Sequence, residues 1–469
     1  MVGTLDLAAA SPATTVASAG QLRGWRLAAF AAPALSVGAL NTPLAVYLPA
    51  YYSGYVGLSL GAVGLAFFMV RALDIGFDPL VGMLVDRTHT RWGQCRPWFA
   101  LGAALISLSS LLLFLAEPGA AFARLVCGLL LVYAGISITG VAHPAWAARL
   151  SSDYDGRSRI YAWLYAGGSV GTFLLLGGPA VLGMMKALPP GGEVHMMGWA
   201  LAIAAPLFVG LAIATIPEPP PAPAWAGVED RVRLSDYLVL LKRPAICRLF
   251  VADVFISLAT GASIGLFVFF WRARGLGMPV INAMILAYLA AAMASVPAWT
   301  WVARRIGKHR AMMASAAGYV VVLPTMAVIP AERLDLIFPA IGFMGLTFAA
   351  STFLIRAMAA DAADEARLHT GLDRIGQVYG LLAATQKLGA AVALGTAFAI
   401  LERMGFKAAD AAASAPVALT ALAVLYVAAP AVLMILGALS LLGYGLDAAA
   451  HARILMELTA RDAEVSDHG

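Results

Sequence analysis

The sequence has little charge and little cysteine. Asp, Glu, Lys and Arg make up 12% of its 469 residues, about half of the roughly 25% that is usual for soluble domains. Hydrophobic residues reach 61%, which excludes a disordered chain and an ordinary water-soluble fold. The three cysteines are odd in number and lie at or near long apolar runs. They exclude a disulfide scaffold and have no zinc or redox spacing.

Signs of catalysis and of nucleic-acid binding are also lacking. The sequence has no nucleophile and base spacing, zinc motif or phosphate-binding glycine loop, so we expect no enzyme, no cofactor and no structural metal. The formal net charge is +5, yet the Lys and Arg residues lie in short clusters between apolar runs. A nucleic-acid-binding protein gathers them on one solvated face, so we expect no nucleic-acid partner.

Twelve apolar runs are long enough to cross a bilayer as helices. About 20 residues span roughly 30 Å of hydrocarbon. The sequence therefore predicts an all-α integral membrane protein with twelve transmembrane helices. We expect the spans at 27–51, 60–84, 98–116, 125–147, 160–185, 197–216, 249–271, 280–302, 311–329, 336–358, 378–401 and 417–446. The last run is long, so we expect it to tilt or to end outside the bilayer.

The loops between these runs alternate between few and many basic residues. With both termini inside, the cytoplasmic segments hold twenty-one Lys and Arg residues and the outer loops hold seven. Cytoplasmic loops carry the positive excess in membrane proteins, so we expect a multi-pass protein of the inner (plasma) membrane with both termini cytoplasmic. Residues 1–22 carry no basic residue before a continuous apolar core, which predicts no cleaved signal peptide.

The chain divides near its middle into two sets of six spans. A proline-rich stretch follows Ile216, and a polar stretch, 228–243, has the composition of a surface helix. We expect an N-terminal bundle over 1–216, a cytoplasmic linker over 217–245, a C-terminal bundle over 246–447 and a cytoplasmic tail over 448–469. Similar basic loops after the second and eighth spans indicate structural repeats that rock about a central site.

Ionisable residues inside the predicted spans cost about 2.5 to 3.5 kcal/mol each, so each needs a reason. Asp74 and Asp78 lie one turn apart on one face of the second span, and Arg71 lies one turn before Asp74. Measured from the inner ends of their spans, Asp78 is roughly 9 Å deep, Asp74 roughly 15 Å and Lys387 roughly 14 Å. The matched depths predict a meeting of opposite charges, either a cation-binding site or a static ion network that locks the halves together.

Other polar residues of the spans have weaker assignments. Asp253 lies just over one turn beyond Arg248, which predicts an ion pair at the membrane interface. Arg356 lies near an inner end, where its side chain reaches the interface. His143 precedes Pro144 in the inner part of the fourth span, where cavity lining and plain packing are equally open. The remaining histidines fall in predicted loops or tails, where a solvated position is expected.

Several motifs occur in register along most of the chain. They are Arg71, Asp74, Asp78 with Pro79, Gly82, Asp86, Arg91-Trp92-Gly93 and Arg96-Pro97-Trp98; Pro144, Trp146 and the run from Asp153 to Arg159; and Asp361, Asp364, Thr370-Gly371, Arg374 and Lys387. With these motifs the chain strongly resembles the glycoside-pentoside-hexuronide:cation symporter family, a branch of the major facilitator superfamily. The resemblance implies two six-helix bundles that work by alternating access.

The resemblance also implies sites. The cation site would consist of Asp74, Asp78, Thr139 and Lys387. We expect substrate-binding positions at Arg71, Gly38, Ala142, His143, Trp146, Tyr165 and Gln386. We expect a cytoplasmic gating network at Asp86, Arg91, Arg157, Arg159, Asp361, Asp364 and Arg374.

Four positions depart from the family pattern. Gly38 and Ala142 stand where the family's sugar carriers have Asp, and Tyr165 stands where they have Arg. Those lost groups hydrogen-bond sugar hydroxyls, so the alternative to a sugar or glycoside is an amphipathic, lysolipid-like solute. Phe77 stands where Na⁺-using members often have Asn. A proton needs one carboxylate whereas Na⁺ needs several oxygen ligands, so H⁺ is favoured over Na⁺.

The leading hypothesis is therefore a cation-coupled secondary transporter, and the alternative from another class is a non-transporting membrane receptor or scaffold. We expect the lipid bilayer, a small-molecule solute and a coupling cation, H⁺ or Na⁺, as its partners. We expect a monomer.

Overall fold

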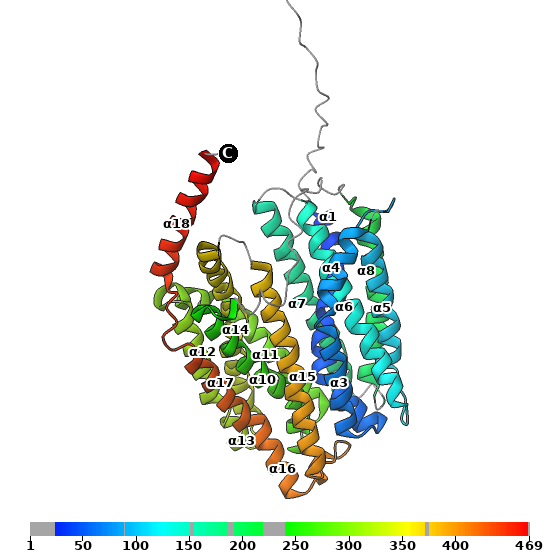
Figure 1. Ribbon diagram of the computed structural model, residues 1–469. Helices are drawn as coiled ribbons and strands as arrows, with labels where there is room; N and C mark the ends of the chain where they lie inside the picture. Colours follow the sequence, from blue (N-terminus) through cyan, green and yellow to red (C-terminus); the bar gives the residue numbers. More distant parts are fainter. Residues whose placement is uncertain are drawn as a thin grey trace, which may run out of the picture.

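The protein consists of long helices that run side by side (Figure 1). The computed structural model describes residues 24–88, 90–150, 154–185, 189, 191–218, 240–370 and 375–467. Within these residues, eleven helices are long and apolar enough to cross a membrane, and a bent pair, α3 with α4, makes a twelfth span. Only an isolated bridge between Thr90 and Gly93 has β geometry there. The predicted all-α membrane fold is confirmed.

The first half of the chain supplies six spans. They are Trp25–Val56, which is made of α1 (Trp25–Val37), η1 (Gly38–Leu40), η2 (Pro43–Tyr47), α2 (Leu48–Tyr51) and η3 (Tyr52–Val56); α3 (Leu60–Asp74) with α4 (Phe77–Arg87); α5 (Arg96–Phe114); α6 (Phe122–Leu150); α7 (Tyr154–Met184); and α8 (Gly192–Thr215). α5 packs against α6 and α8, and α1 packs against α7 and α8.

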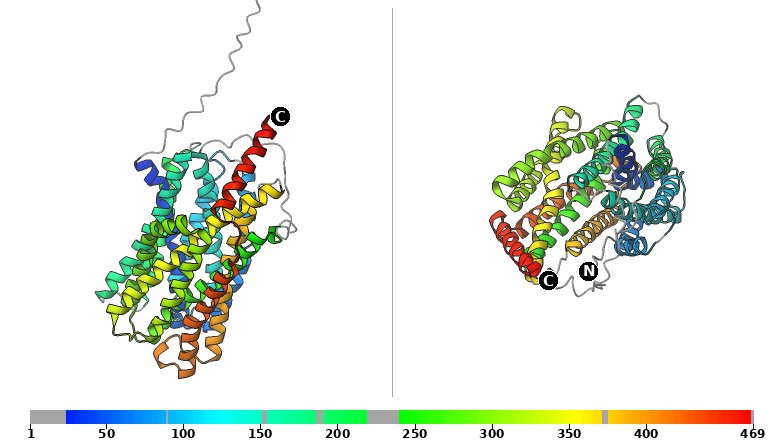
Figure 2. Two further views of the ribbon diagram at one scale, coloured as in Figure 1. Left: turned by 90° about the vertical axis from the view of Figure 1, so that its left-hand side faces the viewer. Right: turned by 90° about the horizontal axis from the view of Figure 1, so that it is seen from above.

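The second half supplies the other six. They are α10 (Pro244–Ala273); α11 (Met278–Ile306); α12 (Lys308–Val322) with α13 (Thr325–Val328); α14 (Leu334–Thr370); α15 (Ile375–Arg403); and α16 (Pro416–Ala423) with η5 (Val424–Ala428) and α17 (Ala429–Ser440). α10 packs against α15 and α17, and α14 packs against α11 and α12. A further helix, α18 (Ala448–Asp467), extends from one end of the molecule, here named the α18 end (Figure 2).

Several span boundaries differ from the prediction, among them those of the first and last spans. The first span continues past residue 51 to Val56 through two π-helical segments, η2 and η3. Pro43 and Pro49 interrupt its hydrogen-bond ladder because proline has no N–H, and the Ser53 hydroxyl bonds back to the Pro49 carbonyl at 2.6 Å. The last span ends at Ser440 rather than at residue 446.

The proline-rich linker begins with an anchor on the N-terminal half. The Glu218 carboxylate accepts the backbone N–H groups of Gln94, Cys95 and Arg96 at 3.0, 2.8 and 3.1 Å. These groups lie at the start of α5, where free N–H groups and the helix dipole favour an anion. The predicted surface helix at 228–243 lies outside the described residues except for its last four.

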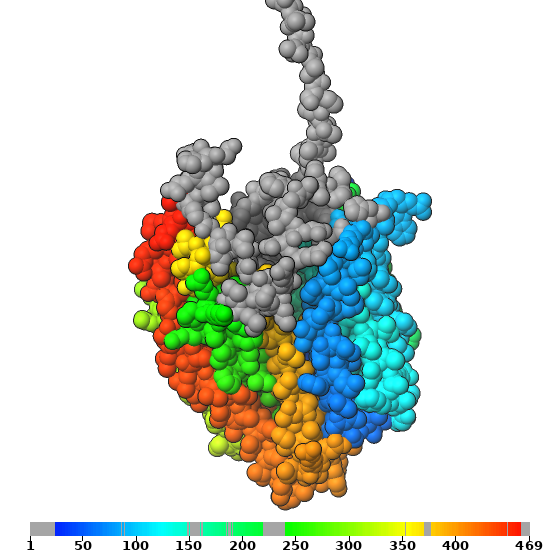
Figure 3. Space-filling view, in the orientation of Figure 1, coloured from blue at the N-terminus to red at the C-terminus, as the bar shows by residue number. Residues whose placement is uncertain are grey.

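The two halves meet along α15. This helix lies between α10 of its own half and α3 of the other half, as the orange, green and blue surfaces of Figure 3 show. The crossing of α3 and α15 is close because glycines face each other there. A Cβ atom on Gly64 would lie 3.3 Å from the Cα of Gly395. Residues on α15 therefore reach directly into the other half of the protein.

Candidate functional site

The second span is broken between its two acids. α3 ends at Asp74, α4 begins at Phe77, and the two axes differ by 42°. Pro79 has no N–H with which to bond the Ile75 carbonyl four residues earlier, so the helix cannot continue unbroken. The expectation of one continuous helix with both acids on one face is therefore wrong in detail. The break puts each acid beside a helix end.

Charges of both halves meet at this break. The Lys387 ammonium of α15 lies 2.9 Å from Asp74 Oδ2 and 2.7 Å from Asp78 Oδ2. Its Nζ also donates to the main-chain carbonyl of Asp74 at 3.3 Å. The Asp74 side chain is only 4% exposed, and that of Asp78 is 37% exposed. The matched depths in the sequence thus correspond to direct contact.

Arg71 adds a second positive charge. Its Nη1 lies 3.2 Å from Asp74 Oδ2, and its guanidinium lies 4.0 Å from the centre of the Tyr133 ring. With Lys387 and Arg71, the cluster holds two positive charges against the two carboxylates. An arriving cation must therefore take over the role of a charge that is already present.

A serine completes the cluster where a threonine was expected. Ser137 Oγ on α6 donates to Asp74 Oδ1 at 3.0 Å. Thr139 instead donates to the carbonyls of Gly135 and Ile136 in its own helix, at 2.8 and 3.1 Å. Residues two apart on a helix point about 200° apart, so only one of the two can face Asp74. The expected placement of Thr139 beside the acids is corrected to Ser137.

The helix ends favour the charges that they hold. Asp78 lies in the first turn of α4, where free N–H groups stabilise an anion, and Lys387 reaches the carbonyl end of α3. Oxygen ligands for a cation are available from both carboxylates and from the Ser137 hydroxyl. No group of three His, Cys, Asp or Glu side chains suited to a metal occurs among the described residues.

A cavity of about 260 Å³ lies between the halves next to this cluster. Arg71 lines the cavity and also contacts Asp74 of the acid cluster. Its other polar lining comes from the first span and from helices of the second half: Asn41, Thr42, Thr260, Ser263, Tyr288 and Tyr319. Phe267 and Phe348 supply aromatic surface. Apart from Arg71, sequence reasoning missed these residues, although isolated polar residues such as Asn41 within apolar runs were a usable signal.

Four predicted substrate positions lie in packed interfaces instead. A Cβ atom on Gly38 would lie 2.5 Å from the Cα of Gly168, so Gly38 is needed for the close crossing of the first span with α7. Ala142 and Trp146 are fully buried in a core cluster of the N-terminal half. His143 Nε2 lies 2.9 Å from the Phe30 carbonyl, which settles its open alternatives in favour of packing.

The last two predicted substrate positions differ from each other. Tyr165 on α7 is 69% exposed and does not line the cavity. Gln386 precedes Lys387 but belongs to another polar group, because its Oε1 lies 3.5 Å from Arg356 Nη2. Arg356 therefore has a partner within the protein. Of the predicted substrate residues, Arg71 alone reaches the cavity.

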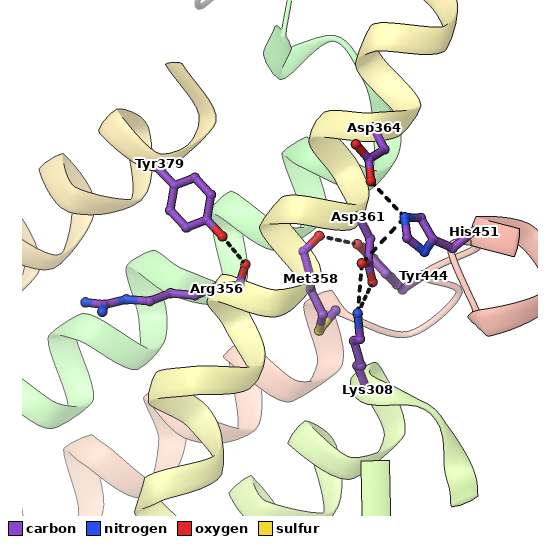
Figure 4. Close-up of polar contacts among 8 residues, drawn as sticks. All are labelled: Lys308, Arg356, Met358, Asp361, Asp364, Tyr379, Tyr444 and His451. Atoms are coloured by element: carbon purple, nitrogen blue, oxygen red, sulfur yellow. Dashed lines mark hydrogen bonds and ion pairs between the residues drawn. The ribbon is translucent and has the colours of Figure 1, made fainter. Parts of the chain in front are cut away.

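Asp361 and Asp364 of the predicted gating network join two residues that the sequence did not point to. Lys308 Nζ on α12 contacts both Asp361 oxygens at 2.8 and 2.6 Å. His451 Nε2 on α18 lies 2.9 Å from Asp364 and 3.7 Å from Asp361 (Figure 4). The expectation that His451 is merely solvated is wrong. The cluster fastens α18 to α14.

Most of the other predicted gating residues have side chains outside the described part of the chain. Arg91 is exposed in the turn before α5. The side chains of Asp86, Arg157 and Arg159 lie outside the described part of the chain, as does the whole of Arg374. A gate that joins these residues across the two halves stays a prediction.

At the end of the molecule opposite α18, here named the far end, hydrogen bonds across the two halves form a polar latch. The latch consists of Tyr47, Asn282 and Glu193. Tyr47 donates to Asn282 Oδ1 at 2.6 Å, and Asn282 Nδ2 donates to Glu193 Oε2 at 3.0 Å. Asn282 is fully buried and belongs to the second half, whereas the other two belong to the first half. These three residues were not predicted from the sequence.

The family of the chain follows from comparison with known proteins. The chain belongs to the family described as MFS/sugar transport protein, which matches residues 29–448. It is a member of the major facilitator superfamily that is like the glycoside-pentoside-hexuronide:cation symporters. The resemblance found in the sequence motifs is confirmed, and the protein is a membrane transporter rather than an enzyme.

Its relatives include named sugar transporters and symporters. The chain is 24% identical over 429 residues to the isoprimeverose transporter of Lactiplantibacillus pentosus, covering 86% of this chain and 85% of that protein. It is 32% identical over 139 residues to the putative glycoside/cation symporter YagG of Escherichia coli (strain K12), covering 28% and 30%. The inner membrane symporter YicJ of the same organism is 28% identical over 141 residues, also covering 28% and 30%.

Solved structures share the fold at low sequence identity. A mutant of the nucleoside transporter NupG is similar with a TM-score of 0.69 and 10% identity, covering 90% of this chain and 100% of that chain. A bacterial homolog to the human lysosomal transporter Spinster, in an inward-facing and unoccupied conformation, has a TM-score of 0.68 and 13% identity, covering 92% and 98%. These likenesses concern the fold alone.

Proposed function

We propose that the protein is a symporter that couples the movement of a cation to that of a small solute, a sugar or glycoside, by alternating access. It acts in the plasma membrane with the α18 end, and hence both termini, in the cytoplasm. The sugar and glycoside transporters among its relatives support the solute class. The excess of basic residues in the loops at the α18 end supports the orientation.

The contact of Lys387 with Asp74 and Asp78 carries this proposal. In the described state Lys387 supplies positive charge to the acids and ties α15 to α3 and α4. H⁺ or Na⁺ bound at the acids supplies that charge instead. Lys387 then loses its partners. Because a buried charge without a partner costs several kcal/mol, Lys387 leaves the acids for the neighbouring cavity. Cation binding thereby releases the second half from the first.

Arg71 links the cation to the solute. It contacts Asp74 and also lines the cavity between the halves, so a solute hydroxyl bound to Arg71 and a cation bound to Asp74 act on the same carboxylate. By linkage, each ligand then changes the affinity of the other by an equal factor. We assign the solute to the cavity lined by Arg71, Asn41 and Tyr288.

The cavity favours a compact solute over a lysolipid. Its volume of about 260 Å³ is just below the roughly 300 to 1,000 Å³ of sites for drug-sized ligands. Tyr288 and Phe348 offer aromatic faces, and Asn41 and Thr260 offer hydrogen-bonding groups, a combination that suits the apolar faces and the hydroxyls of a sugar. A lysolipid also needs room for an acyl chain.

Uptake into proteoliposomes tests the proposal. A panel of disaccharides and glycosides that includes isoprimeverose is offered under an imposed H⁺ or Na⁺ gradient. We expect gradient-driven accumulation of at least one solute, loss of accumulation in Asp74→Asn and Asp78→Asn, and unchanged accumulation in the matched control Asp335→Asn, which alters an exposed acid. Undiminished accumulation in both test variants refutes the mechanism. Absence of flux with every solute favours the receptor alternative.

A further inference from the structure

A third acid is buried in the membrane-spanning region, away from the site described above. Asp253 lies on α10 and is 2% exposed. The predicted ion pair with Arg248 is absent, because the Arg248 guanidinium donates to the Leu442 carbonyl. Within the described residues, no cation lies within ion-pair distance of the Asp253 carboxyl group.

The immediate partners of Asp253 are neutral. The Thr385 hydroxyl of α15 contacts Asp253 Oδ2, and Gln386 is the next residue of α15. α17 meets this stretch of α10 through Gly437, beside Ala252 and Ile256.

One charged group acts on Asp253 from the elements packed around α10, namely Arg356 of α14. The guanidinium of Arg356 points away from the cluster of His451 and Lys308 (Figure 4) and reaches the Gln386 side chain at 3.5 Å. Its hydrogen bond is therefore to Gln386, the neighbour of Thr385, and not to Asp253. An ionised Asp253 is thus buried without a paired cation, a state that costs several kcal/mol.

The hydrogen bonds around Thr385 accommodate a neutral Asp253. A threonine hydroxyl has one proton, yet Thr385 Oγ1 lies beside both Asp253 Oδ2 and the Leu382 carbonyl, the latter at 2.7 Å. When the acid carries a proton, it donates to Thr385 Oγ1, and Thr385 donates to Leu382. When the acid is ionised, Thr385 turns its proton to Asp253. The same three groups therefore satisfy both protonation states.

We propose that Asp253 is a second proton-binding site, separate from the acids of the second span. Thr385 holds Asp253 on one side of α15, and Lys387, two residues further on, holds Asp74 and Asp78 on the other. Uptake of a proton by Asp253 changes the hydrogen bonds that fasten α15 to α10. Its meaning for transport rests on the proposed symport, whereas proton binding itself does not.

Infrared difference spectroscopy on the purified full-length protein tests the site. A pH titration follows the carbonyl stretching band that only a neutral carboxyl group gives. We expect one component of this band to be lost in Asp253→Asn and kept in the matched control Asp335→Asn. It must also remain in the double variant Asp74→Asn/Asp78→Asn, so that a failure of the symport mechanism is distinguishable from a failure of this proposal.

Three results would overturn the proposal. The proposal is overturned if Asp253→Asn leaves the spectrum unchanged. It is also overturned if Asp74→Asn/Asp78→Asn removes the component assigned to Asp253. Thr385→Val covers the case in which Asp253→Asn does not fold. It removes the acceptor of the acid proton, so we expect the component to shift to higher frequency. An unshifted component in Thr385→Val also overturns the proposal.

Discussion

The latch of Tyr47, Asn282 and Glu193 makes the far end of the protein sensitive to a single side chain. Asn282→Leu keeps a similar volume but removes both hydrogen bonds across the halves, and it leaves the buried Tyr47 hydroxyl and the half-buried Glu193 carboxylate unpaired. The substitution destabilises only the state in which the far end is closed, because water hydrogen-bonds to the Tyr47 and Glu193 side chains once the far end opens. A cavity of about 490 Å³ that Tyr47 and Glu193 line brings solvent close to the latch.

The size of the effect follows from the two bonds. Two hydrogen bonds and the unpaired groups left behind amount to about 2 to 4 kcal/mol, which shifts the balance toward an open far end by roughly 30- to 700-fold. Tyr47→Phe removes one bond, worth about 1 kcal/mol, and so shifts the balance by roughly fivefold. The matched control is Tyr52→Phe. Tyr52 is a buried tyrosine of the same span, and its hydroxyl has no hydrogen-bond partner in the described part of the protein.

Distances between spin labels measure the opening. Labels at Glu117→Cys and Glu332→Cys, in exposed loops of the two halves at the far end, are read by double electron–electron resonance, with Cys127 and Cys247 replaced by serine. We expect a longer distance population in Asn282→Leu, a smaller one in Tyr47→Phe and none beyond wild type in Tyr52→Phe. A distribution in Asn282→Leu that matches wild type would show that the latch does not hold the far end shut.

Three further predictions concern single contacts. Gly38→Ala drives a methyl group into α7, so we expect about 1 to 3 kcal/mol of destabilisation in thermal unfolding. The control Gly177→Ala, whose methyl group would meet open space, should be nearly neutral. Equal destabilisation in the two variants would contradict the close crossing of the first span with α7. Ser137→Ala should weaken cation-induced protection against unfolding by roughly tenfold or more in cation concentration, and Thr139→Val should not; the reverse order would restore the sequence-based assignment. His451→Ala should speed hydrogen exchange in α18 several-fold by releasing its anchor, and exchange at the wild-type rate would contradict that anchor.

The span count and the central charge cluster were accessible from the sequence for a simple reason. Helix rise is constant, so depth along a span follows from residue number, and depth alone placed Asp74 and Lys387 at the same level. Proline signals were also readable. Pro79, four residues after Ile75, indicates the break in the second span, although that span was predicted to be one continuous helix.

The sides that helices face were much harder to predict. Ser137 and Thr139 are equally polar, and only the rotation of α6 in the bundle decides which of them meets Asp74. The same ambiguity misassigned Asp253, because Arg248 is close in sequence whereas Thr385 is close in space. The pattern of apolar residues does not define how a helix is rotated about its axis when nearly every face of the helix is apolar.

Attachment between distant segments could not be predicted either. His451 is an isolated histidine in a polar tail, and its anchor on Asp364 depends on where α18 leaves the bundle. The Asp447 carboxylate accepts the Ala450 N–H at 2.8 Å at the start of this helix. That bond lowers the pKa of Asp447 from its usual value and begins the helix at the position from which His451 reaches α14.

The interrupted second span has a mechanical consequence. α3 and α4 are two separate helices joined at a break, and one acid lies on each side of that break. Under the proposed mechanism, the group between the two acids, either the Lys387 ammonium or a bound cation, sets the angle between the two helices. We therefore expect the bend, 42° with the Lys387 ammonium in place, to change when a cation replaces that ammonium, while both helices stay intact.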